Sequence, residues 1–246
     1  MRRFHFSIDD VFDCVLQLSD WNLSVREQPF LAFLDELHEE SGAKTDLYVF
    51  SAAALADGRV RRLADVSDRA AEVLAGAAAF RWGPHARCYA TAPHAQAVDD
   101  ATRTFAELNA DIARIASSDR RADWVRLHYF SEVFELAPLW RAAGITALMT
   151  TDRPAICYRL PATARASLVA TGRAEHNGIG FVTSHLRLEF FAGDAADPAR
   201  FAARLDSAFD RHGFVTVFTH EADLVDPRIR VLARTAFRHA ARRGWV

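Results

Sequence analysis

Apolar runs of two different periods alternate along this chain. Short runs place an apolar residue at every second position, as Phe4, Phe6 and Ile8 do, and longer runs repeat at helical spacing, as Leu108 and Ile112 do. Strands separated by helices pair in parallel, because the helix carries the chain back to the start of the next strand. The pattern therefore predicts an α/β fold with a parallel sheet covered by helices.

The expected elements suit one domain over residues 1–246. Seven strands are typical of an incomplete (β/α)7 barrel, with a doubly wound sheet as the alternative. The expected strands are Phe4–Ile8, Thr45–Phe50, Phe80–Trp82, Trp124–Phe130, Ile145–Met149, Phe181–Phe191 and Phe214–Phe218. The expected helices are 29–41, Ala64–Ala78, His94–Ala116, Glu132–Ala143, Pro198–Arg211 and Pro227–Arg243, with a less regular stretch from Thr150 to Gly180.

Composition excludes several classes of protein. The 246 residues are 50% hydrophobic and 25% charged, with a formal net charge of -2, so no positive field draws in nucleic acid or an anionic membrane. No segment approaches the ~20 apolar residues of a membrane span, and no apolar region of a signal peptide follows Met1. Cys14, Cys88 and Cys157 are scattered and odd in number, which favours a reducing, cytoplasmic location. The oligomeric state is not determined by the sequence.

Two adjacent carboxylates, Asp9 and Asp10, end the first expected strand. Such a pair repels itself unless a positive charge lies nearby, and a divalent cation is a common source of that charge. The alternative interpretation is a solvated Asp-Asp cap for the stretch 11–18 that follows.

Polar side chains also follow most of the other expected strands. The carboxyl ends of parallel strands meet on one face, which is where α/β folds bind ligands. The residues at these ends are His85, Arg126, His128, Tyr129, Asp152, His185, His220 and Glu221. We therefore expect a cleft lined by histidines and carboxylates. Within the sixth expected strand, Thr183, Arg187 and Glu189 share the face of His185, which predicts either an interior face or the wet face of an edge strand.

In this order the motifs resemble those of NodB-type polysaccharide deacetylases, the carbohydrate esterase family 4 superfamily, over nearly the whole chain. Ser7-Ile8-Asp9-Asp10 is similar to the opening Thr-Phe-Asp-Asp of that family, Gly83-Pro84-His85 to its second motif, Arg126–Phe130 to its Arg-x-Pro-Tyr-Gly strand, and His220 to its C-terminal His. The likeness is greatest to divergent members from lipopolysaccharide and surface-polysaccharide biosynthesis. It implies a (β/α)7 barrel, Asp9 as general base, and Asp10 and His85 as metal ligands.

His128 and Phe130 replace the proline and the glycine of the family's Arg-x-Pro-Tyr-Gly strand, and a third position also departs from the family pattern. Tyr89 stands where the second His ligand of the family is expected. His128 ends a strand as well, and our hypothesis is that it supplies the missing nitrogen; His185 and His94 are weaker substitutes. A carboxylate with imidazoles suits zinc, and also cobalt, iron or nickel.

The resemblance implies a metal-dependent hydrolase that removes an acetyl group from an N-acetylated sugar or polysaccharide precursor. Arg126 would keep Asp9 ionised, a backbone amide near Tyr129 would stabilise the oxyanion, and His220 would protonate the leaving amine. Asp152 or Glu221 would orient His220, and Tyr129, Asp152, His185 and Glu221 are candidate substrate-binding residues. The alternatives are a metal-dependent amide or phosphoester hydrolase with a non-sugar substrate, a non-catalytic carbohydrate-binding relative, and a metal-free glycosidase that uses Asp9 with another carboxylate.

Overall fold

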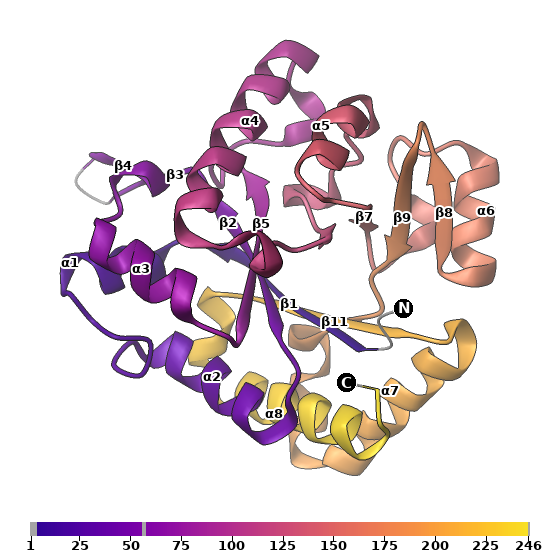
Figure 1. Ribbon diagram of the computed structural model, residues 1–246. Coiled ribbons are helices and arrows are strands. Elements are labelled where there is room, and N and C mark those ends of the chain that lie inside the picture. Colours follow the sequence, from indigo (N-terminus) through magenta and orange to yellow (C-terminus); the bar gives the residue numbers. More distant parts are fainter. Residues whose placement is uncertain (1–3, 56–57, 246) are drawn as a thin grey trace.

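A parallel five-stranded sheet forms the centre of the computed structural model, which describes residues 4–55 and 58–245 (Figure 1). Its strand order is β10-β11-β1-β2-β5, and every neighbouring pair is parallel. The bounds are β1 Phe4–Val11, β2 Thr45–Phe50, β5 Phe80–Ala86, β10 Leu186–Arg187 and β11 Val215–His220. The expected α/β fold with a parallel sheet is confirmed.

A second sheet has the order β6-β7-β9-β8, and its β8–β9 pair is antiparallel. The bounds are β6 Trp124–Val125, β7 Ala147–Thr150, β8 Arg173–His176 and β9 Ile179–Thr183. On one side, an isolated bridge pairs Trp82 of β5 with Arg121, three residues before β6. On the other side, only Ser184 and His185 separate β9 from β10 in the chain.

Helices surround these strands, and α2, α7 and α8 lie together along one side of the larger sheet (Figure 1). Their bounds are α1 Asp13–Asp20, α2 Pro29–Ser41, α3 Asp68–Gly76, α4 Val98–Ile115, α5 Ala137–Ala142, α6 Ala162–Thr171, α7 Pro198–His212 and α8 Pro227–Arg242. The sequence determines where α2 begins. The Gln28 side chain accepts hydrogen bonds from the Phe30 and Leu31 amides, and Pro29 has no N–H group that would need an acceptor. Within the described ranges, no helix combines the length and apolar character that spanning a bilayer would require.

Two predicted strands are shorter than expected. The fourth ends at Val125, and His128–Phe130 form a 3-10 turn in which Tyr129 has φ 56° and Phe130 has φ 52°, backbone that cannot continue a strand. The sixth breaks at Ser184–His185 and gives way to a 3-10 segment, Leu188–Ala196. The prediction of one continuous polar face from Thr183 to Glu189 was therefore wrong.

Three further elements differ from the sequence prediction. The helix predicted over Glu132–Ala143 is the shorter α5, preceded by a 3-10 turn at Phe134–Leu136. The stretch expected to be irregular contains α6 and the β8–β9 hairpin, whose turn includes Asn177 and Gly178 at positive φ. A small hairpin of β3 Ala52–Ala54 and β4 Val60–Arg62 was not predicted, since short exposed strands give a weak signal.

Candidate functional site

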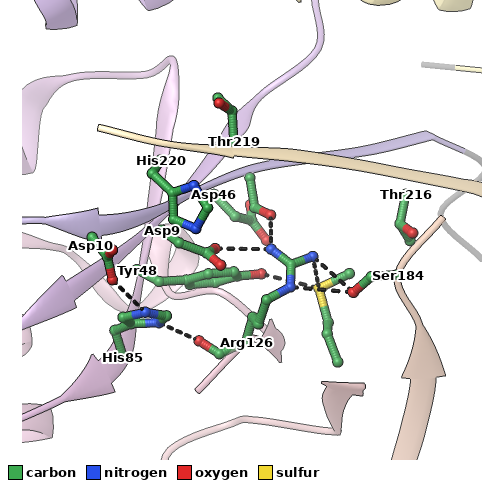
Figure 2. Close-up of polar contacts among 12 residues, drawn as sticks. Asp9, Asp10, Asp46, Tyr48, His85, Arg126, Ser184, Thr216, Thr219 and His220 are labelled. Carbon is green, nitrogen blue, oxygen red and sulfur yellow. Dashed lines mark hydrogen bonds and ion pairs between the residues drawn. The ribbon is translucent and has the colours of Figure 1, made fainter. Parts of the chain in front are cut away.

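Three side chains from separate strand ends meet at one point. The Asp10 Oδ1 atom lies 3.0 Å from Nε2 of His85 and 3.2 Å from Nδ1 of His128, and the two ring nitrogens are 3.2 Å apart (Figure 2 shows Asp10 and His85). Asp10 is at the end of β1, His85 in β5 and His128 just beyond β6. Both histidines are buried, and Asp10 is partly exposed. The structure thus brings together all three predicted metal ligands.

In His85 and His128, the ring nitrogen that points away from Asp10 is hydrogen-bonded to the main chain, and this bond fixes the orientation of the ring. His85 Nδ1 lies 2.6 Å from the main-chain oxygen of Arg126, and His128 Nε2 lies 2.9 Å from that of Tyr89. A carbonyl oxygen only accepts hydrogen bonds, so these two nitrogens carry protons. In the neutral rings, His85 Nε2 and His128 Nδ1 therefore direct lone pairs at Asp10 Oδ1.

Three electron-rich atoms at such distances require a positive charge among them, either an additional proton or a cation. Burial raises the pKa of Asp10, but hydrogen bonds from His128 and His85, which form when these rings carry the additional proton, outweigh burial and hold the pKa well below its usual range. The Asp10 carboxyl group is therefore ionised at neutral pH. Imidazole nitrogens with a carboxylate, each ring anchored by a backbone carbonyl, form the donor set of a zinc-type centre.

The backbone at Asp10 departs from that of a regular strand. Neighbouring residues of a regular strand point to opposite faces. Asp10 instead has φ 59°, and the pairing of β1 with β2 shifts register between Ile8 and Val11. Together with Tyr129 and Phe130, this places three non-glycine residues at positive φ around one cluster, as is common at functional sites.

Asp9 belongs to a second, fully buried group around Arg126. The Arg126 Nη1 atom donates to Asp9 Oδ1 at 2.8 Å and to Ser7 Oγ at 2.9 Å, while its Nε and Nη2 atoms lie 3.2 and 3.1 Å from Ser184 Oγ (Figure 2). The guanidinium carbon also lies 3.8 Å from the centre of the Phe218 ring. Asp9 therefore has a permanent cationic partner, as predicted, and the ion pair fixes its orientation.

His220 ends β11 beside a pair of carboxylates. Its Nδ1 atom lies 2.6 Å from Oε1 of Glu189 and 3.0 Å from Oδ2 of Asp223, and Thr219 also donates to Glu189 Oε1. Burial lowers the pKa of His220, but the hydrogen bond to Glu189 and the charges of Asp9, Glu189 and Asp10 raise it to about 9. The imidazolium form is therefore the main form at neutral pH. These three side chains form a second close group of potential ligand atoms.

Glu189 and Asp223 are the functional candidates that sequence reasoning did not assign. Glu189 was placed only on a polar strand face, although it follows the break in that strand and reaches His220 from the 3-10 segment. Asp223 lies three residues after His220 in a short 3-10 turn, a spacing that brings i and i+3 together. That spacing was the signal available in the sequence.

Neither the Glu221 nor the Asp152 side chain is hydrogen-bonded to His220. The prediction that one of them orients His220 was therefore wrong, because Glu189 and Asp223 occupy that position. Glu221 turns away and accepts hydrogen bonds from the backbone N–H groups of Phe12, Asp13 and Cys14, so it caps α1. Asp152 accepts from Thr151 Oγ1 at 3.1 Å and lies 3.6 Å from Arg187.

The two substitute histidines also lie outside the cluster. His185 accepts from the Thr216 amide at Nδ1 and contacts His212 through Nε2 at 2.8 Å, while burial, His212 and Arg211 lower its pKa to about 3. His94 contacts Ser131, whose hydroxyl donates to the main-chain oxygen of His128. Tyr129 is half exposed, with its ring centre 4.2 Å from that of His128, so it lies beside the candidate centre.

Comparisons with known proteins reach only the level of the fold. No protein-family model matches the chain, and no curated protein matches it. Over 96% of this chain, the structure is similar to 4-alpha-glucanotransferase from Thermococcus litoralis, with TM-score 0.57 and 16% identity. The chain spans 37% of that protein's length. A protein from Bordetella bronchiseptica, described as a candidate polysaccharide deacetylase involved in O-antigen biosynthesis, aligns with TM-score 0.44 and 14% identity, covering 98% of this chain and 89% of that one.

Proposed function

We propose that this chain is a metal-dependent hydrolase that removes an acyl group, in the simplest case acetyl, from the amide nitrogen of an amino sugar. The observation that carries the proposal is the convergence of Asp10 Oδ1, His85 Nε2 and His128 Nδ1, with the opposite ring nitrogens bound to backbone carbonyls. The sugar substrate rests on the sequence resemblance to NodB-type deacetylases. Within that resemblance, we interpret the two sheets as an incomplete (β/α)7 barrel in which β5 lies next to β6.

The side chains of Asp10, His85 and His128 fit a divalent cation, which could be zinc, cobalt, iron or nickel. When bound, such a cation supplies Lewis acidity, which makes water a better nucleophile and polarises an amide carbonyl. The protein's own contribution is to hold two neutral imidazoles in one tautomer. The hydrogen bonds to the Arg126 and Tyr89 carbonyls do this before any ligand arrives.

Asp9 is the proposed general base. It is adjacent to Asp10 in sequence, it is buried, and the Arg126 guanidinium holds it in one orientation. An ionised carboxylate so fixed can accept a proton from water without reorganising. Arg126 is a positioning residue in this scheme, because its contacts are with Asp9, Ser7 and Ser184.

His220 is the proposed general acid. Its Nδ1 atom is hydrogen-bonded to Glu189 and Asp223, so Nε2 is the nitrogen that can release a proton to the leaving amine. Glu189 replaces Asp152 and Glu221 as the orienting carboxylate. Two carboxylates on one imidazole strengthen its hold on the proton, which suits an acid that must stay protonated until the amine departs.

Metal content and product release together test the proposal. We expect purified protein to bind one divalent ion per chain, an Asp10→Ala variant to lose it, and a Glu72→Ala variant on the exposed face of α3 to keep it. Metal-loaded protein should release acetate from N-acetylated amino sugars or nucleotide sugars, and Asp9→Asn should abolish the release while retaining the metal. Stoichiometric metal without acyl release from any sugar amide would favour the hydrolase with a non-sugar substrate. A folded protein that binds no divalent ion would overturn the proposal.

A further inference from the structure

A cavity of about 610 Å³ opens beside Asp10, between the segments that follow β1, β2, β5 and β11. A cavity of this size holds a drug-sized ligand, since such sites span roughly 300 to 1,000 Å³. An acetyl group has only three heavy atoms, each comparable with a water molecule that occupies about 30 Å³ in the liquid. Acetyl would therefore fill a small part of the space.

The walls of this cavity are largely aromatic and aliphatic. Its lining includes Phe12, Phe30, Phe50, Leu224, Val225 and Tyr89. Val225 is 81% exposed and Tyr89 68% exposed, so part of this apolar wall is accessible to a ligand. Phe50 also packs against the rings of both His85 and His128, so the apolar wall begins at the candidate metal centre.

Several polar side chains in the lining are already engaged within the protein. Glu221 is bound to three backbone amides of α1, and Gln28 caps α2 and donates to Gln17. Arg230 uses its Nε on the Leu224 carbonyl and lies over the Phe33 ring. A sugar needs many hydrogen-bonding partners for its hydroxyl groups, so this lining suits an apolar group better than a second sugar ring.

The position of the general acid shows which part of the substrate faces the cavity. Asp10 lines the cavity, as do Glu221 and Ala222, whereas the side chains of His220 and Asp9, like those of His85 and His128, do not. Because His220 is proposed to protonate the leaving amine, the sugar lies on its side of the scissile bond. A group in the cavity is then attached to the carbonyl carbon.

From this arrangement we infer that the cavity binds the acyl chain of the substrate and that this chain is longer than acetyl. The inference rests on the proposed amide hydrolysis and specifies its substrate class as N-acylated amino sugars with acyl groups of medium length. Each methylene that enters the apolar space adds about 0.8 kcal/mol, or roughly fourfold in affinity for the bound state.

Two measurements test the inference. Metal-loaded protein is assayed with N-acetyl-, N-butanoyl- and N-octanoylglucosamine, and we expect kcat/KM to rise by roughly fourfold per methylene until the cavity is full. In parallel, calorimetry follows binding of the same compounds to metal-free protein, where turnover does not interfere. The octanoyl compound should bind at least tenfold more tightly than the acetyl compound.

Substitutions then locate the effect. Ala54→Trp fills the cavity and Val225→Glu places a charge in it, and both should reduce the octanoyl-to-acetyl ratio of binding and of kcat/KM by about tenfold or more. Val231→Glu is the matched control, because Val231 is partly exposed on α8 outside this cavity, and the ratio should not change.

The outcomes separate this inference from the proposed function. Efficient acetyl hydrolysis with no gain in binding or rate for longer chains would overturn the inference and leave the proposed function intact. Tight octanoyl binding without hydrolysis of any amide would overturn the proposed function while supporting the cavity as an apolar binding site. An unchanged ratio in both Ala54→Trp and Val225→Glu would show that the chain binds elsewhere.

Discussion

The imidazole of His128 is anchored by the main chain of Tyr89: His128 Nε2 donates to the Tyr89 carbonyl oxygen at 2.9 Å. In the NodB-type pattern that the sequence resembles, a second histidine is expected at the position of Tyr89. Under the proposed function, His128 supplies the ligand nitrogen, and position 89 contributes a backbone carbonyl that fixes the ring. A backbone group makes this role independent of the side chain at position 89.

This relationship predicts a contrast between two substitutions in metal affinity. His128→Ala removes a ligand, so the dissociation constant for zinc should rise by more than about 100-fold, since loss of an outer-shell partner alone costs 10- to 100-fold. Tyr89→Phe keeps the carbonyl, so the change should stay below about tenfold. Competition titration with a chromophoric chelator measures both. His38→Ala on α2 serves as the control, and equal affinity in His128→Ala and wild type would contradict the assignment.

The sequence predicted the parallel α/β fold because period-2 and helical runs alternate along most of the chain. It also predicted which strand ends carry Asp10, His85 and His128. It did not predict the turn at His128–Phe130, because the left-handed backbone at Tyr129 and Phe130 depends on tertiary contacts and not on residue type. The sequence also did not predict the contact of Glu189 with His220. The alternation of apolar and polar residues continues past Leu186, so it gives no sign that the strand breaks at Ser184–His185.

Substitutions of Arg126 and Asp9 should have strongly non-additive effects on the free energy of unfolding. Both side chains are almost fully buried, so Arg126→Met leaves an uncompensated carboxylate and should lower the free energy of unfolding by about 3–5 kcal/mol. Asp9→Asn removes that charge, and the double variant should recover about 1–3 kcal/mol relative to the sum of the single variants. Urea unfolding of the four proteins measures this coupling.

The exposed Arg103–Asp100 pair on α4 is the matched control for this cycle. Its partners are 68% and 60% exposed, so its coupling should be below about 0.5 kcal/mol. Equal coupling for the buried and the exposed pair would contradict the structural role assigned to Arg126.

His220 should titrate well above an ordinary histidine in metal-free protein. Its pKa is raised to about 9 beside Glu189, compared with an ordinary value of 6.5. Because the folded-state pKa is the higher one, the stability from this contact is complete below about pH 6.5 and is lost as the pH rises through about 9. NMR of the His220 ring should give a midpoint near 9. Glu189→Gln should lower it by about 1 to 3 pH units, since it removes an adjacent opposite charge.

A charge-neutralising change far from His220 tests whether this effect is local. Glu175→Gln, at an exposed position in β8, should leave the midpoint unchanged. A midpoint near 6.5 in wild type would show that Glu189 and Asp223 do not hold the proton on His220.

Glu221 should act on stability and not on the candidate centre. Its carboxylate accepts from the Phe12, Asp13 and Cys14 amides at the start of α1, so Glu221→Ala leaves these donors without a cap and should cost about 2 kcal/mol of unfolding free energy. Glu221→Gln keeps one acceptor oxygen and should cost less. Glu72→Ala on the exposed face of α3 should change stability by no more than about 0.5 kcal/mol. Zinc affinity measured on the same proteins should not change. A large loss of zinc affinity in Glu221→Ala, with stability preserved, would return this residue to the role beside His220 that its position in the sequence first indicated.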